Sequence, residues 1–159
     1  MKIDMLDAYE VRIIEALQED GRLSVQEVSG RIGLSTTPTW KRLKGLEQNG
    51  IISKYTAVID RLSVGLHSCV LAEVNLARHE QHIVEAFELA VMNCPAIVEC
   101  HGTTGHADYM LKILTPDISK YHDFLQSIIF KLPGVTGIKS SVVLKEIKSI
   151  TTVPLNHLY

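Results

Sequence analysis

The sequence predicts an α+β protein in which a small helical domain precedes a larger domain of alternating strands and helices. Residues 6–50 place apolar side chains at helical spacing, punctuated by capping residues and glycines. Residues 69–147 contain two similar strand–helix–strand patterns. A connector without periodicity, "RLSVGLHS", lies between them, so we expect domains at residues 1–60 and 61–159.

The composition is typical of a water-soluble globular protein, with 46% hydrophobic and 21% charged residues. No apolar run reaches the roughly 18 residues that a membrane helix requires. The N-terminal stretch "MKIDMLDAYE" lacks the apolar core of a signal peptide. The three cysteines are irregularly spaced, which favours reduced thiols and a cytoplasmic location.

The first expected element is a helix over "LDAYEVRIIEALQEDG". Asp7 can cap its N-terminus, Glu10 can complete a capping box, and Gly21 ends the apolar periodicity. A shorter helix, "VQEVSGRI", follows, and Ser24 and Glu27 repeat the same capping pattern.

The third expected helix lies within "GLSTTPTWKRLKGLEQNG", with Ser35 as its cap and Pro38 in its first turn. At 100° per residue, Thr39, Leu43 and Leu46 form one narrow stripe that can pack on the other helices. The rest of the helix surface is polar, basic or aromatic, so most of this helix is expected to face outward.

Charge is segregated along the first third of the chain, although the net charge of the whole chain is only −2. Residues 1–20 carry six acidic and two basic side chains, whereas residues 21–50 carry five basic and two acidic ones. Two helices joined by a tight turn at Gly33, the second with a basic face, are the pattern of a helix-turn-helix DNA reader. A solvated surface helix in a three-helix unit is the alternative that the residues alone leave open.

The remaining elements are expected to be strands and helices in a repeated order. "IISKYTAVID" (residues 51–60) is typical of a strand. Strands are then expected at 69–77, 94–101, 108–114 and 132–147, and helices at 80–94 and 117–132. Pro95 and Pro133, which open corresponding strands, are 38 residues apart. This order predicts a βαββαβ, ferredoxin-like sandwich whose helices cover one sheet face, leaving the other to pack on a second copy.

The stretch "ECHGTTGHADY" (residues 99–109) is the densest polar segment of the second domain. Its Cys and His residues match no zinc spacing, and Cys100 and His101 are adjacent on a strand, so their side chains point to opposite faces. We therefore expect neither a metal, nor a cofactor, nor a catalytic centre.

Gly102 and Gly105 bracket two threonines between the second and third strands of this domain. Backbone amides in such a hairpin loop can hold a carboxylate, and Asp108 can accept from an ammonium group. An ordinary glycine-rich turn is the alternative.

The chain resembles the Lrp/AsnC (leucine-responsive, or feast/famine) family of transcription regulators. The resemblance is carried by "LDAYEVRIIEALQEDGRLS", "RIGLSTTPTWKRLKGLEQNGII", "GTTGHADYMLKI", "LPGV" and "VVLKEIK". It implies a winged helix-turn-helix domain joined to a ferredoxin-like regulatory domain, assembly into dimers and often octamers, and a small effector, usually an amino acid. A mainly architectural DNA-compacting protein and a ferredoxin-like enzyme are the alternatives.

The resemblance also implies where the ligands bind. The third helix becomes the recognition helix for double-stranded DNA, and the hairpin loop becomes the effector site through the family's Gly-x-x-Asp-Tyr signature. Trp40 departs from the small or aliphatic residue common at its position, and packing on a neighbouring helix is favoured over stacking on a sugar of the DNA. The expected DNA-binding residues are Ser35, Thr36, Thr37, Thr39, Trp40, Lys41, Arg42 and Lys44. The expected effector-binding residues are Gly102, Thr103, Thr104, Gly105, His106, Asp108, Tyr109 and Ser140.

Overall fold

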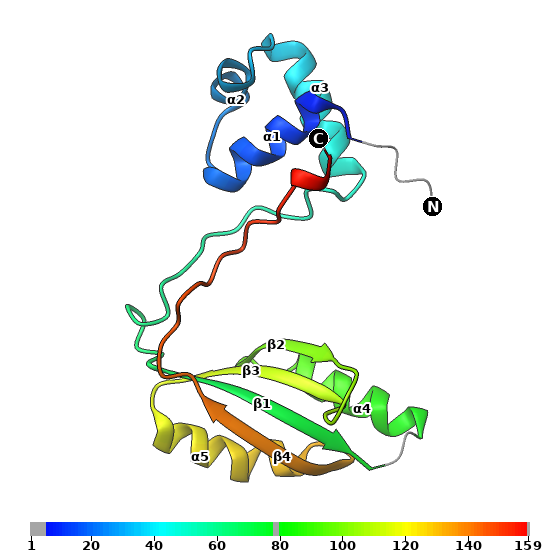
Figure 1. Ribbon diagram of the computed structural model, residues 1–159, viewed down its shortest axis with the longest axis vertical. Coiled ribbons are helices and arrows are strands. Elements are labelled where there is room, and N and C mark those ends of the chain that lie inside the picture. The colour runs from blue at the N-terminus through cyan, green and yellow to red at the C-terminus, as the bar shows by residue number, and fades with distance from the viewer. Residues whose placement is uncertain (1–5, 78–79, 159) are drawn as a thin grey trace. The chain divides into compact units, whose positions relative to one another are not determined.

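The computed structural model describes residues 6–77 and 80–158 (Figure 1). It contains two compact units. One unit comprises the described residues up to Val58 together with the C-terminal segment from Lys148, and the other spans Ile59–Ile147. Residues 1–5 and 159, which the expected domains include, lie outside the described ranges. No helix within those ranges is long and apolar enough to cross a membrane.

The helical unit is built from α1 (Ala8–Glu19), α2 (Val25–Ile32) and α3 (Thr36–Gln48). Both expected capping boxes are present, at the starts of α1 and α2. Gly33 ends α2 in the left-handed conformation, with φ 69°, which turns the chain directly into α3. Ser35 is the N-cap of α3, but its side chain makes no capping hydrogen bond. The three helices enclose a small core of Ile13, Val28, Ile32, Leu43 and Leu46.

The C-terminal segment completes the helical unit, which the sequence analysis did not foresee. The Gln18 side chain on α1 donates to the Val153 carbonyl at 3.1 Å and accepts from the Val153 amide at 2.5 Å. Leu155, two residues later, is 9% exposed. A short 3₁₀ turn, Asn156–Leu158, follows.

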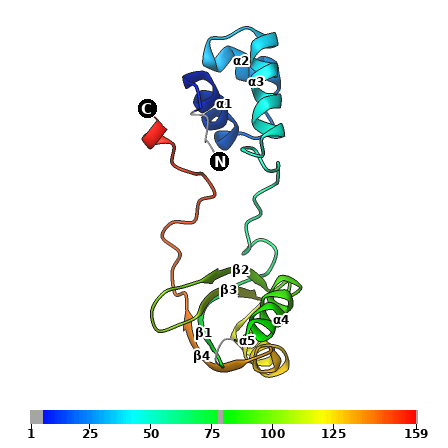
Figure 2. The same cartoon turned by 90° about the vertical axis from the view of Figure 1, so that its right-hand side faces the viewer.

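The second unit is a four-stranded antiparallel sheet with two helices on one face (Figures 1 and 2). Its strands are β1 (Ser68–Leu76), β2 (Ile97–Gly102), β3 (Tyr109–Thr115) and β4 (Val135–Val142), in the order β2-β3-β1-β4. The helices are α4 (Gln81–Met92) and α5 (Ile118–Ser127), and a 3₁₀ turn, Ile129–Lys131, follows α5. This arrangement confirms the expected βαββαβ sandwich.

Side-chain alternation on the central strand explains which face the helices cover. Val70, Ala72 and Val74 of β1 are fully buried, and they pack with Phe87 of α4 in the core. Leu71 points to the opposite face and is 40% exposed. Charged side chains share that opposite face, so it is mixed rather than purely apolar.

The strand expected at residues 51–60 is not formed, and this prediction was wrong. The segment is extended but pairs with no strand among the described residues. A high content of Ile, Val, Thr and Tyr permits a strand, but a ladder partner is also required. Tyr55 instead donates its hydroxyl to Glu47 of α3 at 3.1 Å.

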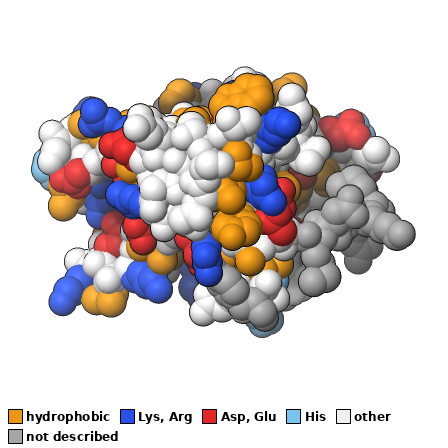
Figure 3. All heavy atoms as spheres, turned by 90° about the horizontal axis from the view of Figure 1, so that it is seen from above, with side chains coloured by type: hydrophobic (Ala, Val, Ile, Leu, Met, Phe, Trp, Pro, Cys, Tyr) orange, Lys and Arg blue, Asp and Glu red, His pale blue; other side chains and the backbone are white. Residues whose placement is uncertain are grey.

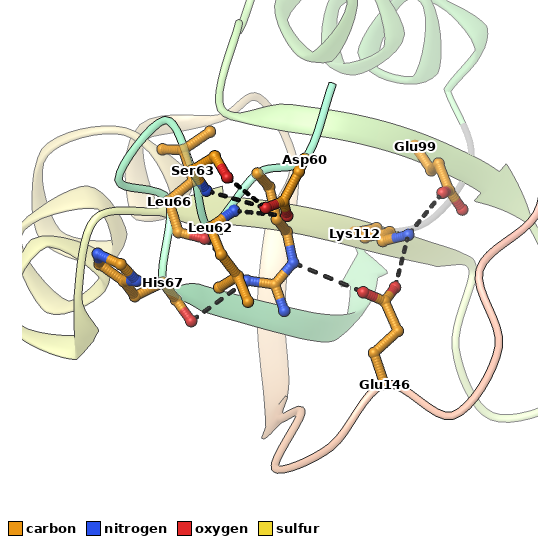
Figure 4. Close-up of polar contacts among 9 residues, drawn as sticks. Asp60, Leu62, Ser63, Leu66, His67, Glu99, Lys112 and Glu146 are labelled. Carbon is orange, nitrogen blue, oxygen red and sulfur yellow. Dashed lines mark hydrogen bonds and ion pairs between the residues drawn. The ribbon is translucent and has the colours of Figure 1, made fainter. Parts of the chain in front are cut away.

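An ion-pair network holds together the two chain segments that border the sheet unit (Figure 4). Arg61, just after the unit begins, lies 3.6 Å from Glu146, just before it ends. Glu146 is in turn 3.9 Å from Lys112 on β3, which bonds Glu99 on β2 at 3.1 Å. The Glu99 carboxylate raises the pKa of Lys112, and Lys112 lowers that of Glu99. Asp60 closes the adjacent turn by accepting from the Ser63 amide and hydroxyl.

Candidate nucleic-acid interface and ligand cavity

The outward face of α3 carries hydroxyl, basic and aromatic side chains, as the sequence analysis expected. These exposed residues are Thr36, Thr37, Trp40, Lys41 and Lys44. Leu43 and Leu46, on the opposite side, fix the helix to α1 and α2. Figure 3 shows basic and hydrophobic side chains lying next to one another on the surface at the top of Figure 1. Such a face can bond phosphate oxygens and base edges together.

Thr39 does not belong to this face, and its assignment as a DNA-binding residue was wrong. Its side chain is completely buried. Its hydroxyl donates to the Ser35 carbonyl at 2.9 Å, one turn earlier in the chain. Thr39 therefore satisfies a backbone group inside the helical unit and has no surface to offer a ligand.

Arg42 lies at the edge of the face and is held by residues of α1 and its cap. Its Nε and Nη2 atoms each lie 3.0 Å from Asp7 Oδ2, and its guanidinium lies 5.5 Å from the Tyr9 ring centroid. Partial burial raises the pKa of Asp7, but the Glu10 amide and the Arg42 guanidinium together outweigh burial, so the pKa of Asp7 is lowered. Arg42 thus joins α3 to the start of α1.

The two lysines of the face differ in their surroundings. Lys44 bonds Glu47 at 2.6 Å, and its side chain remains 46% exposed. Exposed pairs of this kind contribute little free energy, so a phosphate can replace the Glu47 carboxylate. Lys41 is also exposed, and the structure gives it no ion pair within the described ranges.

Trp40 is 50% exposed. Packing on a neighbouring helix, the role favoured from the sequence, cannot cover the half of the side chain that is exposed. The remaining surface of the indole belongs to the outward face of α3.

The β2–β3 loop of the sheet unit is held by Asp108. The Asp108 carboxylate accepts from the Leu76 amide of β1 at 2.8 Å, and its backbone amide donates to Val74 at 3.0 Å. Its carbonyl accepts from the Thr103 amide at 2.9 Å, and the Thr103 hydroxyl donates to Ala107 at 2.7 Å. One amide expected to bind a carboxylate is therefore already used by the loop itself.

Two open cavities lie beside this loop and share Thr103 and Thr104. The larger, of about 870 Å³, is lined by the loop and by the sheet face that the helices leave uncovered. The smaller, of about 350 Å³, is lined by Leu76, Val84, Gly102, Thr103, Thr104, Asp108 and Tyr109. Seven of the eight expected effector residues thus line one cavity or the other.

Two of the expected effector residues are engaged with the helices. Burial and a 2.7 Å hydrogen bond to Glu88 of α4 raise the pKa of Tyr109 to about 12, so its hydroxyl stays protonated and directed at α4. Ser140 shares a 2.6 Å hydrogen bond with Tyr121 of α5 and lines neither cavity. The structure does not bring Ser140 to the loop.

Sequence reasoning missed seven residues that line the larger cavity, and four of them carry long or polar side chains: Glu73, Asn75, Met110 and Lys139. Glu73 and Lys139 are directly paired across β1 and β4. Strand alternation places Glu73 and Asn75 on the face opposite Val74, but only the strand order shows that this face meets the loop. No group of three potential metal ligands occurs among residues 6–77 and 80–158.

Comparison with known proteins connects both units to one family. Residues 6–53 match a winged helix-turn-helix DNA-binding domain, and residues 69–153 match the Lrp/AsnC ligand binding domain. The chain belongs to the Lrp/AsnC family of transcriptional regulators. As a member of the Lrp/AsnC family it is a DNA-binding regulator and not an enzyme, as the sequence analysis expected.

Similar proteins support this membership along nearly the whole chain. The proline dehydrogenase transcriptional activator of Rhizobium radiobacter is 40% identical, over 92% of this chain and 94% of its own length. The leucine-responsive regulatory protein of Escherichia coli is 38% identical, over 90% and 87% respectively. A transcriptional regulator from Neisseria meningitidis, solved as its L-Met complex, superposes with a TM-score of 0.93 at 37% identity, covering 97% of this chain and 99% of that one.

Proposed function

We propose that this Lrp/AsnC regulator reads double-stranded DNA through the outward face of α3, and that an amino acid bound beside the β2–β3 loop changes its DNA binding or its assembly. The observation that carries the first part is the exposed set of Thr36, Thr37, Lys41 and Lys44 on one face of the second helix of a helix-turn-helix. In such motifs the second helix enters the major groove and its N-terminal residues contact base edges.

The chemistry of the larger cavity supports an amino-acid effector. An amino acid carries one cation and one anion, and each needs a partner when it leaves water. Glu73 and Lys139 supply one charge of each sign beside the loop, and Asp108 lines the smaller cavity on its other side. The similar regulator from Neisseria meningitidis binds L-Met, which favours an effector of this class.

The uncovered sheet face supports assembly into a homodimer, with octamers as the expected higher form. Leu71 and Met110 lie on that face among charged side chains. A face with both apolar and paired polar positions suits a self-complementary interface between two copies. Changing Leu71 to Asp should shift the sedimentation equilibrium of the full-length protein toward the monomer.

Salt-dependent DNA titration tests the α3 face. Lys41→Ala and Lys44→Ala should each weaken binding, and each should lower the slope of log affinity against log salt by about one unit if the lysine contacts phosphate. Lys120→Ala is a matched control, because Lys120 is an exposed lysine on α5 that pairs with Asp123 much as Lys44 pairs with Glu47. Unchanged affinity in both α3 variants would contradict this assignment.

A thermal-shift screen of the amino acids tests the effector site. A ligand that binds only the folded protein raises the melting temperature, by an amount equivalent to about 2.7 kcal/mol at a hundred times its dissociation constant. L-Met and L-Leu are the first candidates. If no amino acid raises the melting temperature, an architectural role in which the loop serves assembly becomes the better explanation.

A further inference from the structure

Trp40 is the single tryptophan of the chain, and half of its surface is exposed. Within the described part of the chain no aromatic ring stacks on it and no guanidinium lies over it. The guanidiniums of Arg12 and Arg42 lie instead over Tyr9, at 6.0 and 5.5 Å. Tryptophan combines a large apolar body with one N–H donor and is enriched at interfaces, so this exposed indole is a candidate contact with a partner.

The position of Trp40 on α3 indicates what the partner is. Trp40 is the fifth residue of α3, with Thr36 one turn before it and Lys44 one turn after it, both exposed. Leu43 and Leu46 hold the neighbouring side of the helix in the core. The indole therefore lies within a hydroxyl-bearing and cationic face, in the half of a recognition helix that meets base edges rather than the DNA backbone alone.

Most of the indole surface is apolar, and the edges of the base pairs in the major groove present one apolar group, the 5-methyl group of thymine. On the basis of the DNA-binding role of α3 proposed above, we propose that Trp40 contacts a thymine methyl group in the major groove. This contact sets a preference for thymine at that position of the DNA site. Trp40 is then a specificity-determining residue, while the flanking threonines and lysines position the helix on phosphates.

The test pairs a change in the protein with removal of a single methyl group from the DNA. Full-length wild-type protein and Trp40→Ala are each used to select sites from a random double-stranded DNA library. In the wild-type site, each thymine is then replaced singly by deoxyuridine, which removes only the 5-methyl group. One or two of these replacements should each weaken wild-type binding about three- to fivefold, the effect of losing one buried methyl-sized group.

The same replacements should leave the affinity of Trp40→Ala unchanged, and that variant should select sites with no preference at those positions. Trp40→Phe should keep part of the sensitivity to deoxyuridine, because a smaller ring still reaches the methyl group. Lys41→Ala is the control: it should weaken binding at every site and retain the full sensitivity. Since half of Trp40 is exposed, the melting temperature of Trp40→Ala should stay close to that of the wild type.

Two results would overturn the inference. Either no deoxyuridine replacement weakens wild-type binding, or Trp40→Ala retains the wild-type sensitivity to it. A uniform loss of affinity in Trp40→Ala without any coupling to thymine would point to a sugar or phosphate contact and would also overturn it. Failure of the wild-type protein to select any site would instead refute the DNA-binding role of α3 itself.

Discussion

Asp108 has two candidate roles, and two substitutions separate them. Its carboxylate accepts from the Leu76 amide at 2.8 Å and so fastens the β2–β3 loop to β1. A carboxylate has room for further donors, so the same side chain can also face the ammonium group of an effector. Asp108→Ala removes both functions, whereas Asp108→Asn keeps an oxygen for Leu76 and loses only the charge.

The loss of stability can be worked from this contact. Hydrogen bonds to charged groups contribute about 1.5–3 kcal/mol, and Leu76 is only 8% exposed, so its amide would be left without a partner near the core. We expect Asp108→Ala to lower the free energy of unfolding of the sheet unit by about 2 kcal/mol. In a domain of this size that corresponds to a fall in melting temperature of about 10 °C. Asp108→Asn should cost less than half as much.

Calorimetric melting of the full-length variants measures the structural role, and isothermal titration with the amino acid found by the thermal-shift screen measures the binding role. If Asp108 faces the ammonium group, Asp108→Asn should lower effector affinity roughly ten- to a hundredfold while DNA binding without effector survives. Wild-type stability in Asp108→Ala would refute the structural role. Full effector affinity in Asp108→Asn would refute the ammonium contact.

Two further predictions concern stability. Gly134 has φ 72°, and an added Cβ would lie 2.2 Å from Ile83 Cγ2. Gly134→Ala should therefore lower the free energy of unfolding of the sheet unit, measured by urea denaturation, by at least about 1–2 kcal/mol. Gly137→Ala is the control with open space around the added atom and should match the wild type more closely. Asp7→Ala should cost the helical unit about 1 kcal/mol through loss of the α1 cap, while Asp7→Asn keeps the cap and loses mainly the Arg42 charge pair. The pKa of Asp7 is lowered in the folded protein, so the charged carboxylate stabilises the helical unit fully above about pH 4. This stabilisation is lost as the pH falls through the lowered pKa. Asp7→Ala should therefore make the free energy of unfolding less dependent on pH in the acid range.

The sequence by itself determined the features that depend on neighbours along the chain. The capping boxes at Asp7 and Ser24 join groups three residues apart, so the residue types alone predict them. Apolar periodicity likewise predicted the three N-terminal helices and the repeated strand–helix–strand order, and the positions of Gly102 and Gly105 predicted the loop between β2 and β3. These are local consequences of helix and strand geometry.

Tertiary structure decided everything that depends on a partner distant in sequence. Residues 51–60 have strand composition but no ladder partner among the described residues. Glu73 and Lys139 line the same cavity as the β2–β3 loop because the strand order of the sheet places β1 and β4 beside it. Gln18 and Val153 form hydrogen bonds although they are 135 residues apart. The local pattern of neither segment predicts these bonds, because they depend on the path of the folded chain.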